Sequence, residues 1–183
     1  MRMKLHHSLT DQRGFTIAEV LIAAVIMTLS FVALATVVPI ASYGVQEGYQ
    51  ISSATFLAEQ KLEQAKNLPW VGSPANDCLG VSASATTAPT VPAGATCTNG
   101  GTNVAAGGAV PWLADEGAVA NFPGHARNVR ITNCSTGGGC AGVTDAAMRL
   151  VTVSVIYTAL NATGEIGTTG ARPIQVQMVV SQR

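Results

Sequence analysis

The apolar residues of this chain are concentrated near its N-terminus. From Val20 to Val45 no residue carries a charge, and residues 20–38 are an almost unbroken apolar run of 19 residues. A helix needs about 18–20 such residues to cross the hydrocarbon core of a bilayer. The pattern therefore predicts a hydrophobic, membrane-spanning helix within residues 15–45, and Pro39 predicts a kink or a locally melted turn in it.

Further along, the apolar pattern narrows to one face of a helix. Residues that are small or apolar, except Lys61, recur at spacings of three and four until Pro69 stops the helix. The face consists of Ala54, Leu57, Ala58, Lys61, Leu62, Ala65 and Leu68. This amphipathic segment, residues 46–69, would extend the first one into a helix of about residues 15–68. An unbroken helix of that size is on the order of 78 Å long, which exceeds a bilayer, so its distal half must cover a soluble domain.

Residues 70–183 are predicted to form that soluble head. Residues about 71–125 show little periodicity, and Gly, Ala, Thr, Pro, Ser and Asn dominate residues 82–109. A segment of this kind predicts a long functional or flexible loop rather than regular structure. We expect Trp70 and Trp112 to anchor the loop on the helix.

Strand patterns follow in residues about 127–183. Apolar and polar residues alternate in residues 128–132, 149–158 and 174–181, and turn residues occupy 161–164 and 168–170. Antiparallel strands with one apolar face need a cover, and the helix face that begins at Ala54 offers one. The predicted fold class is α+β, with a long N-terminal helix packed on a small antiparallel β-sheet.

Charge is scarce and unevenly placed. Only 11% of residues are charged and the formal net charge is zero, which excludes nucleic-acid binding by bulk positive charge and a charged disordered chain. Three basic residues, Arg2, Lys4 and Arg13, precede the apolar run, and none follows until Lys61. The positive-inside rule predicts a single span with a cytoplasmic N-terminus and an exported C-terminal part.

One acidic residue lies at the start of the apolar run. The run is longer than the 7–15 residues typical of a signal-peptide core, and no Ala-x-Ala site closes it. Glu19 lies where a carboxylate is costly, which makes it a functional candidate. Cleavage between Gly14 and Phe15 would create an amine one helical turn before Glu19. The two charges could then neutralise each other, within one subunit or between neighbours.

The same residues carry a family resemblance. Residues 13–22, Arg-Gly-Phe-Thr-Ile-Ala-Glu-Val-Leu-Ile, resemble the processing signal of type IV prepilins and pseudopilins. The resemblance implies a leader of residues 1–14 that prepilin peptidase removes, N-methylation of Phe15, and a role for Glu19 in subunit registration. It also implies the lollipop-like pilin fold, in which a long N-terminal helix packs on a small antiparallel sheet. It further implies assembly with other pilins or pseudopilins. The chain would lie in the inner membrane before assembly and in a periplasmic or cell-surface filament afterwards.

A second resemblance concerns the end of the predicted helix. Residues 56–70 resemble the stem end of PilV-like minor pilins and of the I-type pseudopilin of type II secretion. We therefore expect a minor pilin of a type IV pilus, with a type II secretion pseudopilin as the alternative. An alternative of another class is a membrane-tethered periplasmic binding module or adhesin that uses the loop of residues 82–109.

The four cysteines, Cys78, Cys97, Cys134 and Cys140, lie on the exported side, where disulfides form. Three connectivities are possible. We favour the sequential one because Cys134 and Cys140 enclose a short, glycine-rich loop that can close. No C-x-x-C occurs, and His125 is the only histidine beyond the leader, so we expect no metal site. No catalytic constellation is evident, and we expect no enzymatic activity, no cofactor and no nucleic-acid partner.

Overall fold

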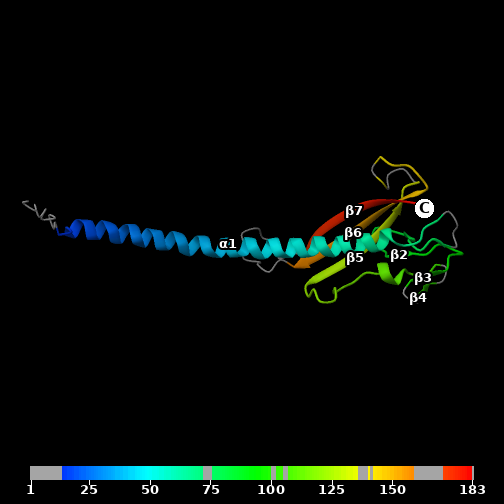
Figure 1. The fold of residues 1–183 in the computed structure, drawn as a ribbon, viewed down its shortest axis with the longest axis horizontal. Helices are drawn as coiled ribbons and strands as arrows, with labels where there is room; N and C mark the ends of the chain where they lie inside the picture. Colours follow the sequence, from blue (N-terminus) through cyan, green and yellow to red (C-terminus); the bar gives the residue numbers. More distant parts are fainter. Residues whose placement is uncertain are drawn as a thin grey trace, which may run out of the picture. The chain divides into compact units, whose positions relative to one another are not determined.

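The computed structural model describes residues 14–71, 76–99, 102–104, 107–135, 140, 142–158 and 171–182. The chain divides into two compact units, residues 1–44 and 45–183, and helix α1 (Ile17–Lys66) belongs to both (Figure 1). One long N-terminal helix is combined with small antiparallel sheets. The predicted α+β class is therefore confirmed, and the arrangement is consistent with a pilin-like fold.

In the first unit, α1 is continuous through Pro39. Of the two predicted alternatives, the melted turn is therefore wrong, and the kink stays a prediction. Proline removes one backbone donor, but a single missing bond does not stop a long, cooperative helix. Side-chain hydroxyls in this segment bond back to backbone carbonyls; for example, the Ser42 hydroxyl donates to the Pro39 carbonyl at 2.8 Å. Thr28, Ser30 and Thr36 do the same. The polar groups of an otherwise apolar helix are thus satisfied internally.

The second unit is built on a three-stranded antiparallel sheet. Its strands are β5 (His125–Asn133), β6 (Met148–Thr158) and β7 (Ala171–Ser181), in the order β5-β6-β7. The three predicted strands are confirmed, with somewhat wider bounds. The register places Val129 opposite Val153 and Val153 opposite Val176, which brings the apolar side chains onto one face. The predicted turns at 161–164 and 168–170 lie outside the described residues.

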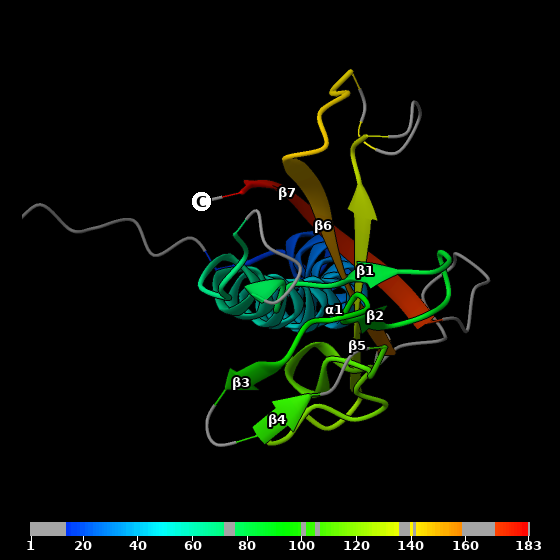
Figure 2. The same ribbon diagram turned by 90° about the vertical axis from the view of Figure 1, so that its right-hand side faces the viewer.

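The part of α1 that belongs to the second unit covers that apolar face (Figure 2). All seven residues of the predicted helix face, from Ala54 to Leu68, are buried. They pack with sheet residues that are fully buried, among them Val129, Ile131 and Val153. Because helix and sheet each offer one apolar face, their packing forms the core of the head.

The segment expected to be a loop is partly regular. It contains the pair β1 (Val81–Ser82) and β2 (Pro89–Thr90), the pair β3 (Cys97–Asn99) and β4 (Thr102–Val104), and the 3₁₀ helix η2 (Pro111–Leu113).

The described part of the expected loop thus contains short regular elements. Strands of two or three residues are too short for alternation to show in the sequence. Several residues of this segment join the core, including Val91, Val110 and Leu113. Trp70 is buried in the same core, and Trp112 packs against it.

Two disulfides fasten this segment and the end of β5. Cys78 is bonded to Cys97 and Cys134 to Cys140, which is the sequential pairing, and all four residues are buried. The two bonds close loops of different size, with sequence separations of 19 and 6. A larger closed loop restricts the unfolded chain more.

We predict unequal effects when the disulfides are removed in pairs. Replacing Cys78 and Cys97 with Ala should lower the free energy of unfolding by about 3 kcal/mol, and replacing Cys134 and Cys140 by about 2 kcal/mol, from loop-closure entropy. Urea unfolding of the detergent-solubilised full chain under oxidising conditions measures both values. A larger loss from the Cys134–Cys140 pair would contradict this explanation.

Candidate functional site

The predicted cleavage junction precedes the helix. Gly14, Phe15 and Thr16 have no helical conformation, all three are exposed, and Phe15 retains 86% of its accessible surface. Exposed, non-helical backbone near a chain end is a preferred site of proteolysis. The Gly14–Phe15 peptide bond is therefore accessible to a processing enzyme.

Thr16 and Glu19 form a capping box at the start of α1. The Glu19 amide donates to Thr16 Oγ1 at 3.3 Å, and the Thr16 amide donates to Glu19 Oε2 at 3.1 Å. The Thr16 hydroxyl also donates to Glu19 Oε2, at 3.2 Å. A Thr-x-x-Glu pattern of this kind satisfies amides that have no partner within the helix, and it sets where the helix begins. Thr16 was not among the functional residues expected from the sequence, although the Thr-x-x-Glu pattern indicates it.

The capping box changes the expected geometry around Glu19. Because α1 begins at Ile17, Phe15 does not lie on the helical face of Glu19, as a helix starting at Phe15 would require. Both bonds from Thr16 end on Oε2, which leaves Oε1 for another donor. The carboxylate also lies in the first turn, where the helix dipole favours negative charge.

The helix beyond the junction has an apolar surface on all sides. Side chains of residues 14–46 are exposed throughout, with 65% exposure for Leu29 and 70% for Phe31. By length and composition, α1 is the one helix in the described part of the chain that could cross a membrane. An apolar surface of this extent indicates contact with lipid or with other apolar helices.

Comparison with known proteins identifies this same region. A family model described as the prokaryotic N-terminal methylation motif matches residues 9–35, which include the junction and the capping box. The match supports a type IV prepilin-like family, and it implies processing by prepilin peptidase and assembly with other pilins. Together with the apolar helix, it suggests an inner-membrane anchor before assembly. Neither curated proteins nor solved structures gave a match.

A second polar cluster joins the head's irregular segment to α1. The Glu116 carboxylate lies 2.7 Å from Lys61 Nζ and 2.7 Å from an Arg127 guanidinium nitrogen. Lys61 also donates to the carbonyl of Trp112 at 2.7 Å, and Arg127 to the carbonyl of Leu57 at 2.9 Å. Both basic side chains are buried, so loss of their common acidic partner would leave two charges poorly compensated.

Another buried ion pair holds the disulfide segment. Asp77 Oδ1 accepts a hydrogen bond from Arg149 at 2.6 Å and a second one from the Gly80 amide at 3.0 Å. The Arg149 guanidinium also lies over the Trp70 ring, 4.3 Å from its centre. These contacts position loops; among the described residues no group of three His, Cys, Asp or Glu side chains could hold a metal.

Glu116 gives the head a pH dependence. Burial alone would raise the pKa of its carboxyl, but the hydrogen bonds from Lys61 and Arg127 and their charges outweigh burial and hold the pKa below the ordinary 4.5. A carboxyl with a lowered pKa in the folded state stabilises the fold above its unfolded pKa. That stabilisation is lost as the pH falls through the lower, folded-state value.

We predict that acid destabilises the head partly through Glu116. In urea titrations of the full chain from pH 7 to pH 3, the free energy of unfolding should fall below about pH 4.5. The Glu116→Gln variant should be less stable at pH 7 and show a shallower fall. Glu59→Gln, at an exposed position of α1, controls for the change in net charge. Parallel pH curves for the wild type and Glu116→Gln would contradict the assignment.

Proposed function

We propose that this chain is a minor pilin of a type IV pilus or a related filament. Prepilin peptidase would cleave it between Gly14 and Phe15 and methylate the new amine of Phe15, and the chain would assemble through its N-terminal helix. The observation that carries the proposal is the exposed, non-helical junction followed directly by a capped, apolar helix. The motif match at residues 9–35 covers both features.

The two halves of α1 suit two successive environments. Residues 15–45 would cross the inner membrane in the precursor and then bury against related helices in the filament core. Small residues permit close approach of such helices without a loss of packing. In this segment they include Ala23, Ala24, Ala33 and Ala35. Residues 46–69 would carry the head of residues 70–183, in agreement with the buried face that begins at Ala54.

Glu19 would act in assembly. In the precursor, Thr16 provides its hydrogen bonds. Cleavage would add an ammonium group at Phe15, and Glu19 Oε1 is free of the capping bonds and could accept it. An ammonium paired with this carboxylate avoids the cost of several kcal/mol that an unpaired charge pays in an apolar filament core.

Two alternatives share part of this evidence. A type II secretion pseudopilin would have the same junction and helix, and neighbouring genes for a secretion channel rather than for a retraction motor would favour it. A membrane-tethered periplasmic binding module would keep its leader and remain in the membrane.

We predict cleavage between Gly14 and Phe15. Co-expression with an active prepilin peptidase should give a chain that begins at Phe15 and carries one added methyl group, as measured by intact mass. Gly14→Leu should block cleavage. Because nothing lies within 4 Å of a Cβ added at Gly14, the effect would arise in the peptidase and not in this chain's fold. An inactive peptidase is the control, and a mature chain with any other first residue would argue against the proposal.

Two variants of Glu19 distinguish the role of its charge from the role of its capping hydrogen bonds. Glu19→Ala and Glu19→Gln should both be cleaved, and both should be incorporated into sheared filaments more than about tenfold less than the wild type, because neither can neutralise the new ammonium. Quantitative immunoblots of the filament and membrane fractions measure this. Normal incorporation of Glu19→Gln would show that the charge has no role.

A further inference from the structure

The outer face of the three-stranded sheet, opposite the face that α1 covers, contains a groove of about 350 Å³. Its floor is a row of polar side chains set by the strand register. Asn128 on β5 lies opposite Ser154 on β6, and Ser154 lies opposite Gln175 on β7. Thr152 lines the groove from the next row. The floor therefore presents amide and hydroxyl groups from three strands.

Ser154 lies in the floor without a partner. Its residue is only 8% exposed, and its hydroxyl forms no hydrogen bond with any described residue. The Ser154 hydroxyl faces the groove, where a ligand from outside the chain can reach it. Asn128, Thr152 and Gln175 likewise have no side-chain hydrogen bond within the described part of the chain. The groove therefore offers four polar side chains whose hydrogen-bonding groups are available to a ligand from outside the chain.

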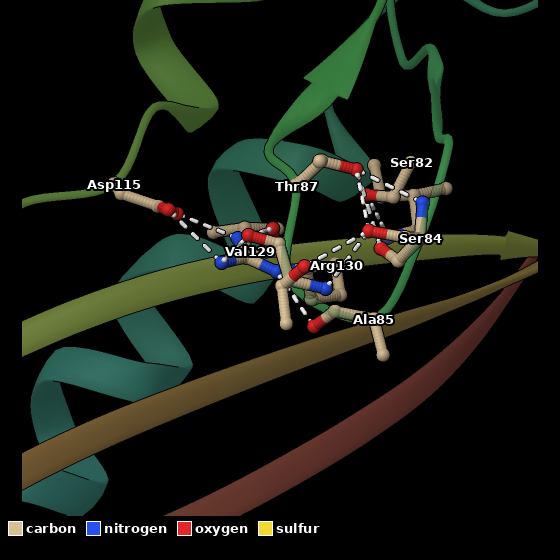
Figure 3. Close-up of polar contacts among 9 residues, drawn as sticks. Ser82, Ser84, Ala85, Thr87, Asp115, Val129 and Arg130 are labelled. Carbon is tan, nitrogen blue, oxygen red and sulfur yellow. Dashed lines mark hydrogen bonds and ion pairs between the residues drawn. The ribbon is translucent and has the colours of Figure 1, made fainter.

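Arg130 and Ala85 line one part of the groove. The polar contacts that fix the Arg130 side chain are drawn in Figure 3. Its guanidinium donates to the Ala85 carbonyl at 3.1 Å, to the Thr86 carbonyl at 3.0 Å and to both oxygens of Asp115. A fifth bond reaches the Val129 carbonyl at 2.7 Å, so all five donors of the side chain are occupied. This part of the groove is therefore formed before any ligand binds.

The charge of the lining restricts the ligand. Asp115 neutralises Arg130, and no donor of that guanidinium remains for a phosphate or carboxylate. The other lining residues are uncharged. Ile156 and Pro173, which face each other across β6 and β7, add a small apolar surface. The groove thus fits a neutral ligand that has many hydrogen-bonding groups and a small apolar group.

We propose that this groove binds an uncharged, N-acetylated oligosaccharide. The side-chain amides of Asn128 and Gln175 pair with its acetamide groups, and the Ser154 and Thr152 hydroxyls pair with its ring hydroxyls. The acetyl methyl packs on Ile156 and Pro173. The groove volume lies within the range of about 300–1,000 Å³ usual for small-ligand sites. An added peptide strand would need backbone edges, whereas this face offers side chains.

The test uses the full chain in detergent and chitotriose, the uncharged trimer of N-acetylglucosamine, as the probe. NMR titration should give saturable shifts of the side-chain amides of Asn128 and Gln175. Gln175→Ala should weaken binding about fivefold, as expected for one lost hydrogen bond. Gln177→Ala, at an exposed position of the same strand and outside the groove lining, should leave binding within twofold. The deacetylated trimer should bind more weakly because it lacks the acetyl groups and carries charge.

Three outcomes would overturn the proposal. The first is the absence of saturable shifts, and the second is equal weakening by Gln175→Ala and Gln177→Ala. The third is a stronger response to an uncharged blocked tripeptide, which would indicate a protein partner instead. A chain that binds chitotriose but is never cleaved at Gly14 would separate this inference from the proposed filament role.

Discussion

The internal hydrogen bonding of α1 is the constraint on which the rest of the structure depends. A helix satisfies its own backbone, so it can pass from an apolar to an aqueous environment without leaving polar groups unpaired. The capping box of Thr16 and Glu19 supplies side-chain acceptors for backbone amides at the start of the helix. Side chains then decide the environment of each half: the first unit exposes apolar groups on every side, and the half in the head buries one face.

Buried charges organise the head around that helix. Glu116 forms ion pairs with Lys61 and Arg127, and Asp77 forms one with Arg149. Each pair connects the segment of residues 76–125 to α1 or to the sheet. Hydrophobic packing alone is not directional, whereas removal of one partner from a buried ion pair strongly destabilises the fold. These pairs therefore give a segment of low periodicity a defined position on the core.

The N-terminal segment and the head suggest separate tasks. The proposed processing and assembly use the motif, the junction and the apolar helix, which precede the head in the sequence. The groove on the outer sheet face lies on the side opposite the helix-covered core. Binding of a ligand there would not require the core to open. The proposed recognition site and the proposed assembly helix therefore use different residues of the chain.

The sequence by itself determined the apolar run, the buried helix face from Ala54 to Leu68 and the three strands of the sheet, because each repeats with its own period over many residues. It also contained the capping box, since Thr16 and Glu19 are only three residues apart. Tertiary structure alone decided the partners of Glu116 and Asp77, the short strands from β1 to β4, and the row of Asn128, Ser154 and Gln175. Those contacts join residues far apart in the chain, and local periodicity carries no information about which distant segments meet.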